Sequence, residues 1–205
     1  MFITFEGLDF SGKSTQARLL QKYFQTNNLS SILIREPGGT PISEKIRQIL
    51  LDKVNSEMIS LTEFLLFSAS RAQLIHEVIK PNLEKGNIVI CDRYYDSSTA
   101  YQGYAGQLET ENVNKVNHFA TGNLIPDITF LIDVKPEVSL ERAARRSEHL
   151  DRIEIKNRPF YEAVYNGFHK IASSEGRVKI INGSKTIEQI HSDIINIVNH
   201  KINKT

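Results

Sequence analysis

The chain has a single cysteine, and it lacks both a secretory signal sequence and a long hydrophobic run. With only Cys91 no internal disulfide can form, and its position in the apolar run Ile88–Cys91 favours a buried small hydrophobe over a nucleophile. Without a signal peptide, a lipidation motif or an apolar segment long enough to span a bilayer, the sequence predicts a soluble, cytoplasmic protein.

An excess of charge of either sign is also absent. The chain has 25 Lys and Arg residues and 24 Asp and Glu residues, which gives a formal net charge of +1. Such a chain creates no broad field that would attract nucleic acid or an anionic membrane, so we expect neither as a partner. The histidines are scattered singly, without zinc-ligand spacing, and indicate no metal centre of that kind.

What the chain does have is a regular alternation of short apolar runs with longer amphipathic segments. This pattern predicts an α/β fold with a parallel sheet, in one domain spanning residues 1–205, whose ligands bind beyond the carboxyl ends of the strands. We expect strands at Phe2–Glu6, Ser31–Arg35, Asn87–Cys91, Asp127–Asp133 and Val178–Ile181. We expect helices at Lys13–Phe24, Leu61–Lys85, Pro136–Arg146, Phe160–Ser173 and Thr186–Ile202.

A G-x-x-x-x-G-K-S motif lies between the first expected strand and the first expected helix. A strand that turns abruptly into a helix with its amides aimed at one anion needs glycine where the backbone bends and approaches the phosphate. In such a P-loop the lysine reaches the β- and γ-phosphates of a nucleotide and the serine binds Mg²⁺. A glycine turn that binds nothing is the alternative, which the flanking strand and helix disfavour. The motif and the residue after it are Gly7, Leu8, Asp9, Phe10, Ser11, Gly12, Lys13, Ser14 and Thr15.

Three strand ends carry polar groups: Arg35–Gly39, Asp92–Tyr94 and Asp133. A P-loop enzyme usually needs a carboxylate at the end of a neighbouring strand to hold Mg²⁺ directly or through water. Asp92 and Asp133 both qualify by position, and we favour Asp92 because Arg93 beside it places a phosphate clamp next to a metal ligand. The alternative is that Asp92 pairs with an arginine or caps the next helix.

Several segments together resemble those of thymidylate kinases. Asp92–Gln102 (D-R-Y-Y-D-S-S-T-A-Y-Q) resembles the signature segment of that family, Arg35–Thr40 its second block, and Leu65–Arg71 its base-binding helix. With the P-loop and Leu150–Glu154, the resemblance covers nearly the whole chain. It implies a three-layer P-loop kinase fold with a five-stranded parallel sheet flanked by helices and a short mobile lid at approximately 142–157. It also implies a homodimer that transfers the ATP γ-phosphoryl group to dTMP, giving dTDP, with Mg²⁺.

The resemblance further assigns roles at the base of the monophosphate. Phe67 would stack on thymine, and Arg71, one helical turn later, would donate to its exocyclic oxygen, so that both face one cleft. Ser98 and Gln102 would contact the base edge. A phenylalanine of the plain core and a solvated helix start are the respective alternatives.

The same resemblance assigns a second set of residues to the phosphate and sugar of dTMP. Arg35 and Arg93 would hold the phosphate, a task that suits a planar guanidinium better than lysine. Glu36 would orient the acceptor or a metal-bound water. Asp9 would accept a hydrogen bond from the 3′-hydroxyl, and Tyr101 would pack under the deoxyribose.

A cluster of arginines follows the fourth strand. Arg142, Arg145 and Arg146 lie on or near one helix, and the like charges at i,i+4 repel by roughly a few tenths of a kcal/mol. Either nearby glutamates neutralise a solvated face, or the cluster forms a lid that closes over the ATP phosphates. Because Phe10 stands where some thymidylate kinases carry a P-loop arginine, the resemblance to the bacterial type favours the lid. The expected catalytic residues are Lys13, Arg93, Arg142, Arg146 and Arg152.

Two other functions stay open at this point. A regulatory GTPase would need N-K-x-D, but Asn114–Asn117 reads N-K-V-N and falls in a predicted helix. A deoxynucleoside kinase would need a carboxylate base for a neutral hydroxyl, and Glu36 could serve. Phosphorylation of thymidine rather than dTMP would identify the latter.

Overall fold

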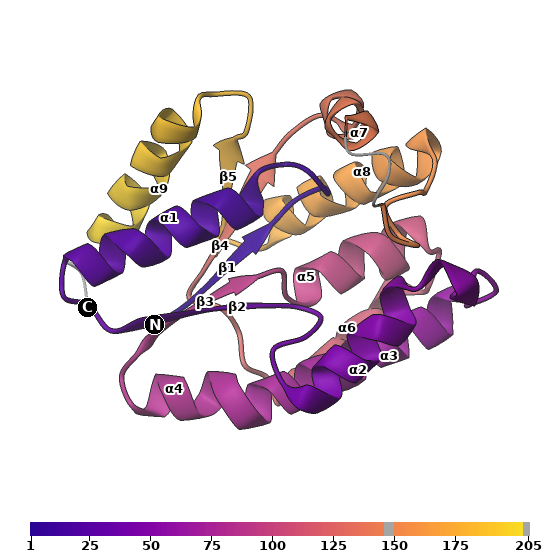
Figure 1. Cartoon of the computed structure of the whole chain (residues 1–205), viewed down its shortest axis with the longest axis horizontal. Coiled ribbons are helices and arrows are strands. Elements are labelled where there is room, and N and C mark those ends of the chain that lie inside the picture. The colour runs from indigo at the N-terminus through magenta and orange to yellow at the C-terminus, as the bar shows by residue number, and fades with distance from the viewer. Residues whose placement is uncertain (146–149, 203–205) are drawn as a thin grey trace.

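Five short runs rich in β-branched and aromatic residues form one parallel sheet, whose three central strands are buried under helices. The computed structural model describes residues 1–145 and 150–202. Its strand order is β2-β3-β1-β4-β5, and all neighbouring strands run parallel (Figure 1). The expected five-stranded α/β fold is confirmed, and each strand lies within one residue of its expected bounds. The strands are β1 (Phe2–Glu6), β2 (Ser31–Arg35), β3 (Ile88–Asp92), β4 (Ile128–Asp133) and β5 (Val178–Asn182).

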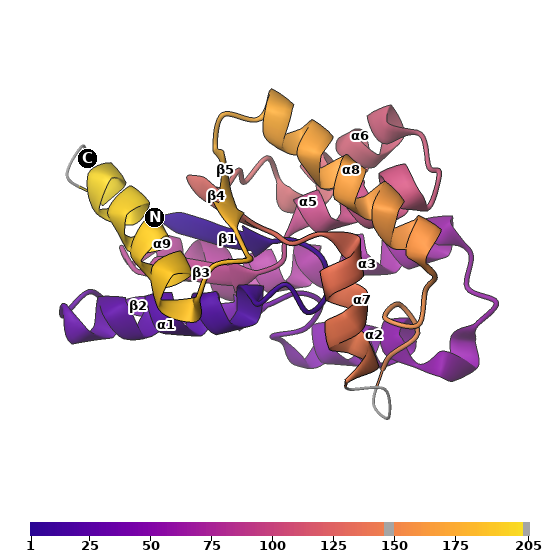
Figure 2. The ribbon, with the colours of Figure 1, turned by 90° about the horizontal axis from the view of Figure 1, so that it is seen from above.

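Helices cover both faces of this sheet, as the two views show (Figures 1 and 2). The segments α1 and α9 pack on one face, whereas α3, α8 and the helix that follows β3 cover the other. A π-helical turn, η2 (Ile75–Ile79), joins α3 to α4, and a second, η3 (Thr99–Ala105), continues α5. The helices are α1 (Lys13–Thr26), α2 (Pro41–Leu51), α3 (Ser60–Leu74), α4 (Lys80–Glu84), α5 (Tyr95–Ser98), α6 (Thr110–Thr121), α7 (Pro136–Ala144), α8 (Arg158–Ser174) and α9 (Ile187–Ile202), with a 3₁₀ turn at η1 (Lys53–Asn55).

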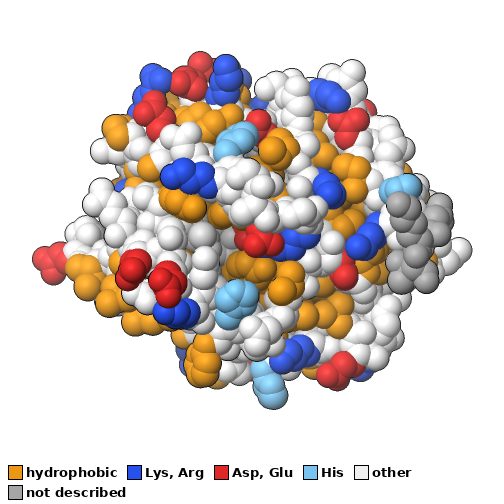
Figure 3. Space-filling view, turned by 180° about the vertical axis from the view of Figure 1, so that it is seen from behind, with side chains coloured by type: hydrophobic (Ala, Val, Ile, Leu, Met, Phe, Trp, Pro, Cys, Tyr) orange, Lys and Arg blue, Asp and Glu red, His pale blue; other side chains and the backbone are white. Residues whose placement is uncertain are grey.

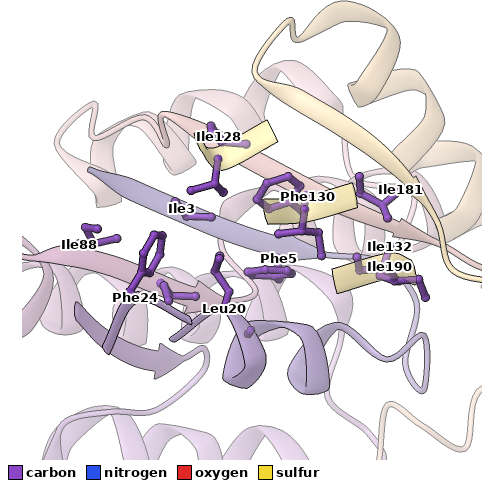
Figure 4. Close-up of a cluster of buried hydrophobic side chains, with 14 of the residues drawn as sticks. Ile3, Phe5, Leu20, Phe24, Ile88, Ile128, Phe130, Ile132, Ile181 and Ile190 are labelled. Atoms are coloured by element: carbon purple, nitrogen blue, oxygen red, sulfur yellow. The ribbon is translucent and has the colours of Figure 1, made fainter. Parts of the chain in front are cut away.

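The largest apolar cluster fills the space between the sheet and helices α1 and α9 (Figure 4). Phe5 and Phe130 lie on neighbouring strands with ring centroids 5.4 Å apart, and Leu20 and Phe24 of α1 cover them without exposed surface. Full burial of side chains of this size contributes about 1.5–3 kcal/mol each to stability. This packing fixes α1, and therefore the loop in front of it, against the end of β1.

The helices differ from expectation in three places. The expected helix Leu61–Lys85 runs from Ser60 to Glu84 through η2, and the expected helix Pro136–Arg146 ends at Ala144 as α7, with Arg146 outside the described residues. Helix α2 was not anticipated. Its start carries a local signal, because the Thr40 side chain accepts a hydrogen bond from Ser43 N and proline stands at the first helical position.

The strand register determines where polar side chains gather. Phe5 of β1 and Arg35 of β2 both lie opposite Asp92 of β3, so these strand ends meet at one edge of the sheet. The chain leaves β1 between β3 and β4, where the strand order changes direction, and this is the position at which doubly wound sheets bind ligands. The P-loop and the arginine-bearing strand ends are therefore neighbours.

The surface opposite to the view of Figure 1 carries basic and acidic side chains interspersed among hydrophobic ones (Figure 3). Among the described helices, none is both long enough and apolar enough to cross a membrane.

Candidate active site

The loop after β1 has the backbone geometry that its glycines predict. Gly7 and Gly12 have φ of 137° and 98°, and a Cβ at Gly7 would lie 2.6 Å from the Ile132 carbonyl oxygen. Any side chain there would therefore collide with the backbone of β4. Phe10 also takes a left-handed conformation, with φ of 60°, which is uncommon for a residue of this size. The loop is thus held in a strained shape at the point where it turns into α1.

Lys13 lies inside this turn and is 7% exposed. Its Nζ donates to the Leu8 carbonyl at 3.2 Å and lies 4.0 Å from Asp9 Oδ1. Burial, reinforced by the positive charge of Arg93, lowers the pKa of Lys13 below its ordinary value. A buried ammonium next to another cation is stabilised by an incoming anion, which is what a phosphate supplies.

Asp9 is the centre of a hydrogen-bonded cluster below the loop. Its carboxylate accepts from Arg93 Nη2, from the Tyr101 hydroxyl at 2.9 Å and from the Tyr161 hydroxyl at 3.3 Å. Burial acts to raise the pKa of Asp9, but the charges of Arg93 and Lys13 outweigh it, so that the pKa lies below the ordinary value. An ionised carboxylate near the phosphate site is therefore compensated by two cations.

Arg93 is itself held in an uncommon conformation directly after β3. Its φ is 74°, and its Nη1 donates to the Gly7 carbonyl at 3.1 Å and to Ser97 Oγ at 2.9 Å. Its guanidinium carbon lies 5.0 Å from the centre of the Tyr101 ring. These contacts hold the planar cation against the P-loop backbone.

A cleft of about 640 Å³ brings most of the expected site residues together. Of the P-loop, Leu8 is the clearest exception, because its side chain packs in a core cluster with Leu131 and Tyr161 rather than facing the cleft. Gly7 and Ser11 also lie beneath the surface of the loop. The expected residues that line the cleft are Asp9, Phe10, Gly12, Lys13, Ser14, Thr15, Arg35, Glu36, Phe67, Arg71, Asp92, Arg93, Ser98, Tyr101, Gln102 and Arg142.

Arg71 of α3 is 1% exposed, yet it is almost fully hydrogen-bonded. Its Nε donates to Glu36 Oε2 at 2.7 Å, Nη1 to Asn117 Oδ1 at 3.2 Å, and Nη2 to Ser98 Oγ at 3.0 Å and to the Tyr94 carbonyl at 3.4 Å. A guanidinium has five N–H groups, so these contacts leave one Nη1 donor for a ligand. The alternative that Phe67 belongs to the plain core is disfavoured by its place in the cleft wall.

Glu36 lines the cleft, and its carboxylate is already paired with Arg71. Its Oε2 is committed to Arg71, and its Oε1 is buried without a hydrogen-bond partner among the described residues. Burial raises the pKa of Glu36 to about 7, against the lowering effect of Arg71. The carboxylate thus orients Arg71, and the role of Glu36 at the acceptor or a metal-bound water stays a prediction.

Arg152 also departs from its expected place over the phosphates, since its side chain is 3% exposed and absent from the cleft wall. Its Nε donates to the Leu50 carbonyl at 2.8 Å, and its Nη2 pairs with Glu63 Oε2. A buried guanidinium needs such acceptors, and α2 and α3 provide them. Arg152 therefore anchors the end of the expected lid to the two helices below it.

Arg142 of α7, in contrast, reaches the P-loop directly. Its Nη1 donates to the carbonyls of Phe10 at 3.0 Å and Ser11 at 3.3 Å, while Ser139 Oγ donates to the Asp9 carbonyl at 2.7 Å. Helix α7 is thereby docked on the loop. Arg145 also lines the cleft, whereas Arg146 lies outside the described residues.

Two residues fit the expected magnesium site. Ser14 lines the cleft, and so does Asp92, whose Oδ1 is buried without a partner among the described residues. Asp133, the other candidate, is engaged with His169 Nε2 at 3.0 Å. A hard cation that keeps several waters and is bound through one carboxylate, a hydroxyl and substrate phosphates matches the donors at Ser14 and Asp92.

The residues that sequence reasoning missed include three charged lining residues and one buried acid. Arg18 lies one helical turn after Ser14, a spacing that could have identified it, whereas Arg47 lies on the unanticipated α2 and donates to the Pro37 carbonyl at 2.9 Å. Glu154 follows Arg152 in the lid and lines the cleft.

The buried acid is Glu6, the last residue of β1, whose Oε1 accepts a hydrogen bond from Tyr94 N at 2.8 Å. Burial, with repulsion from Asp96 as the next cause, raises the pKa of Glu6 to about 8.

Replacing Glu6 with glutamine is expected to stabilise the protein at alkaline pH. The pKa of Glu6 is about 8 in the folded protein, against an ordinary value of 4.5. The stability that protonated Glu6 contributes is therefore fully present below pH 4.5 and is lost as the pH rises towards 8. The free energy of unfolding of Glu6→Gln should exceed that of the unsubstituted protein by an amount that grows between about pH 5 and 8. Urea unfolding at several pH values measures this difference, and Glu111→Gln, at an exposed position, is the control. A difference that stays constant with pH would contradict the prediction.

One cleft thus combines a P-loop, several arginines and a buried carboxylate oxygen of Asp92 that has no partner among the described residues. The fold and this site together define the class of P-loop phosphotransferases. The thymidylate kinase family model matches residues 5–194, and this chain belongs to the thymidylate kinase family.

Individual relatives are similar over nearly their full length. The thymidylate kinases of Symbiobacterium thermophilum and Fervidobacterium nodosum are each 46% identical over 199 residues, covering 97% of this chain and 92% and 98% of the respective relative. The crystal structure of thymidylate kinase from Ehrlichia chaffeensis superposes with a TM-score of 0.79 at 35% identity, covering 97% of this chain and 98% of that one.

Proposed function

We propose that the protein transfers the γ-phosphoryl group of ATP to dTMP, giving dTDP. The observation that carries this proposal is that one cleft is lined both by the P-loop and by Phe67 and Arg71 of α3. Arg93 lines the same cleft and donates hydrogen bonds to the Gly7 carbonyl and to Asp9. A pyrimidine monophosphate placed with its base on Phe67 would direct its phosphate at Arg93 and Lys13.

The reaction needs alignment and charge stabilisation rather than a base, because the attacking phosphate oxygen is already anionic. In this proposal Lys13 and Arg142 bind the donor phosphates, and Arg93 and Arg35 hold the acceptor phosphate. Asp9, which accepts hydrogen bonds from Arg93 and two tyrosine hydroxyls, would also accept one from the sugar 3′-hydroxyl. When bound at Ser14 and Asp92, Mg²⁺ would neutralise charge on the donor phosphates.

We expect Asp92→Asn to raise the Mg²⁺ concentration needed for half-maximal turnover by about tenfold or more, because an amide oxygen is a weaker ligand than a carboxylate. Initial rates at fixed ATP over a Mg²⁺ titration measure the effect. Asp133→Asn is the matched control, since its carboxylate is engaged with His169 and lies away from the cleft. An unchanged Mg²⁺ requirement in Asp92→Asn would remove Asp92 from the metal site.

A coupled ADP-release assay tests the proposed function. With ATP as donor, dTMP, dUMP, dCMP and thymidine are offered as acceptors. Strong turnover of dTMP supports the proposal, and the extent of dUMP turnover measures how far the site requires the thymine methyl group. Phosphorylation of thymidine in place of dTMP would instead identify a deoxynucleoside kinase.

We also propose that the chain forms one kinase domain with a lid at approximately 142–157, and that it acts as a cytoplasmic homodimer. Support for the dimer comes from α3 and its neighbours, where Leu61 is 50% and Leu65 49% exposed. Ile59, directly before α3, is 64% exposed, and Phe119 on the adjacent α6 is 90% exposed. Burying these side chains between two copies would remove apolar surface from water.

A further inference from the structure

Three residues of α3 recur at intervals of four and share one side of the helix. They are Glu63, Phe67 and Arg71, of which Phe67 and Arg71 line the cleft. On the helix that follows β3, Ser98 and Gln102 are also four residues apart, and both line the cleft. The two helices thus present matching rows of side chains to the end of the cleft where we place the base.

These rows are joined by two hydrogen-bonded pairs. Arg71 Nη2 donates to Ser98 Oγ at 3.0 Å, and Gln102 Nε2 donates to Glu63 Oε1 at 2.7 Å. Phe67 lies between Glu63 and Arg71 along α3. A flat ring stacked on Phe67 would therefore meet a cationic donor on the Arg71 side and the amide of Gln102 on the other.

Glu63 determines which end of that amide faces the cleft. It is 8% exposed, and its second oxygen, Oε2, pairs with Arg152, which is itself buried. With Arg152 beside it, Glu63 accepts hydrogen bonds only, so Gln102 must turn its NH₂ group towards Glu63. The Oε1 atom of Gln102 receives no hydrogen bond from the described residues and is the end left for a ligand.

We propose that Glu63 is a positioning residue that selects the base: by holding the amide nitrogen of Gln102, it leaves only an acceptor to face the pyrimidine. The inference rests on the proposed function, because it requires a base stacked on Phe67. Thymine presents an N3–H donor next to its O4 acceptor, which matches an acceptor at Gln102 and a donor at Arg71. Cytosine presents an N3 acceptor and a C4 amino group, so both contacts would be reversed.

The test compares dTMP with 5-methyl-dCMP, which keeps the methyl group and the sugar but reverses both hydrogen-bonding groups. In Glu63→Gln the side chain can both donate and accept, so the Gln102 amide is free to turn. We expect the ratio of kcat/KM values, dTMP over 5-methyl-dCMP, to fall by about tenfold. We also expect KM for dTMP to rise more than kcat falls, because the base lies far from the phosphates, whereas partial misfolding would lower kcat alone.

Gln102→Met tests the same contact without changing the Glu63–Arg152 pair, and it should lower the ratio by a similar factor. In the Glu63→Gln/Gln102→Met double variant the ratio should equal that of Gln102→Met, since Glu63 acts through the amide. Glu111→Gln, the same chemical change at an exposed position of α6, should leave the ratio unchanged.

Each outcome bears on one claim. If the unsubstituted protein does not phosphorylate dTMP, the proposed function fails. If it does, an unchanged ratio in Glu63→Gln or in Gln102→Met overturns this inference alone. A further fall in ratio when Glu63→Gln is added to Gln102→Met would also overturn it, because Glu63 would then act by another route.

Discussion

Lys13→Ala is expected to reduce kcat by roughly 10²- to 10³-fold or more, the loss that follows removal of one preorganised donor to developing charge. Lys13 is the buried cation within the P-loop turn, and it lies 4.0 Å from Asp9. Its charge would stabilise the phosphoryl group in the transition state of the transfer, so the substitution should lower kcat rather than raise KM. Single-turnover and steady-state phosphoryl transfer from ATP to dTMP measure it.

The same substitution should leave the fold intact. Burial lowers the pKa of Lys13, which means that the charged side chain is destabilised in the folded protein. Removing it should therefore not lower the midpoint of thermal unfolding, although Asp9 keeps only Arg93 as a compensating cation. Lys22→Ala, at an exposed position of the same helix, is the control for changes in α1. Near-normal phosphoryl transfer by Lys13→Ala would refute the assigned role.

The residues near the P-loop were predictable because their signals are local. A strand, two glycines, a lysine and an amphipathic helix follow one another within β1 and α1, and strand ends must meet at one edge of a parallel sheet. Position alone therefore identified Asp92 and Arg93. It could not show that Arg93 adopts a left-handed backbone conformation, because no local pattern distinguishes this from ordinary extended chain.

The partners of buried charges were not predictable, because they join segments far apart in the sequence. Arg152 pairs with Glu63 across 89 residues, and Arg71 pairs with Glu36 across 35. Each pair forms because a buried guanidinium must find an acceptor, but the sequence does not reveal which side chains become buried together. For this reason Arg152 was expected over the phosphates, and Glu36 was expected at the acceptor, although both have other partners.

Arg93→Ala is expected to reduce kcat/KM for dTMP by roughly 10³-fold and to destabilise the fold by about 3 kcal/mol. The loss of activity follows from removal of the proposed clamp on the acceptor phosphate. The loss of stability has a different cause, since Asp9 and Tyr101 would lose the guanidinium that both contact. Steady-state kinetics and urea unfolding of the same preparation measure the two effects.

Adding Asp9→Asn to Arg93→Ala separates these two causes. A neutral amide no longer needs a cation in the buried cluster, so the double variant should regain part of the lost stability. It should not regain turnover, because the phosphate clamp is still missing and the acceptor for the 3′-hydroxyl is weakened. If turnover returned together with stability, the loss in Arg93→Ala would be a consequence of misfolding, and Arg93 would have no direct role at the phosphate. If stability did not return, the charge of Asp9 would not be what requires Arg93 in the folded protein.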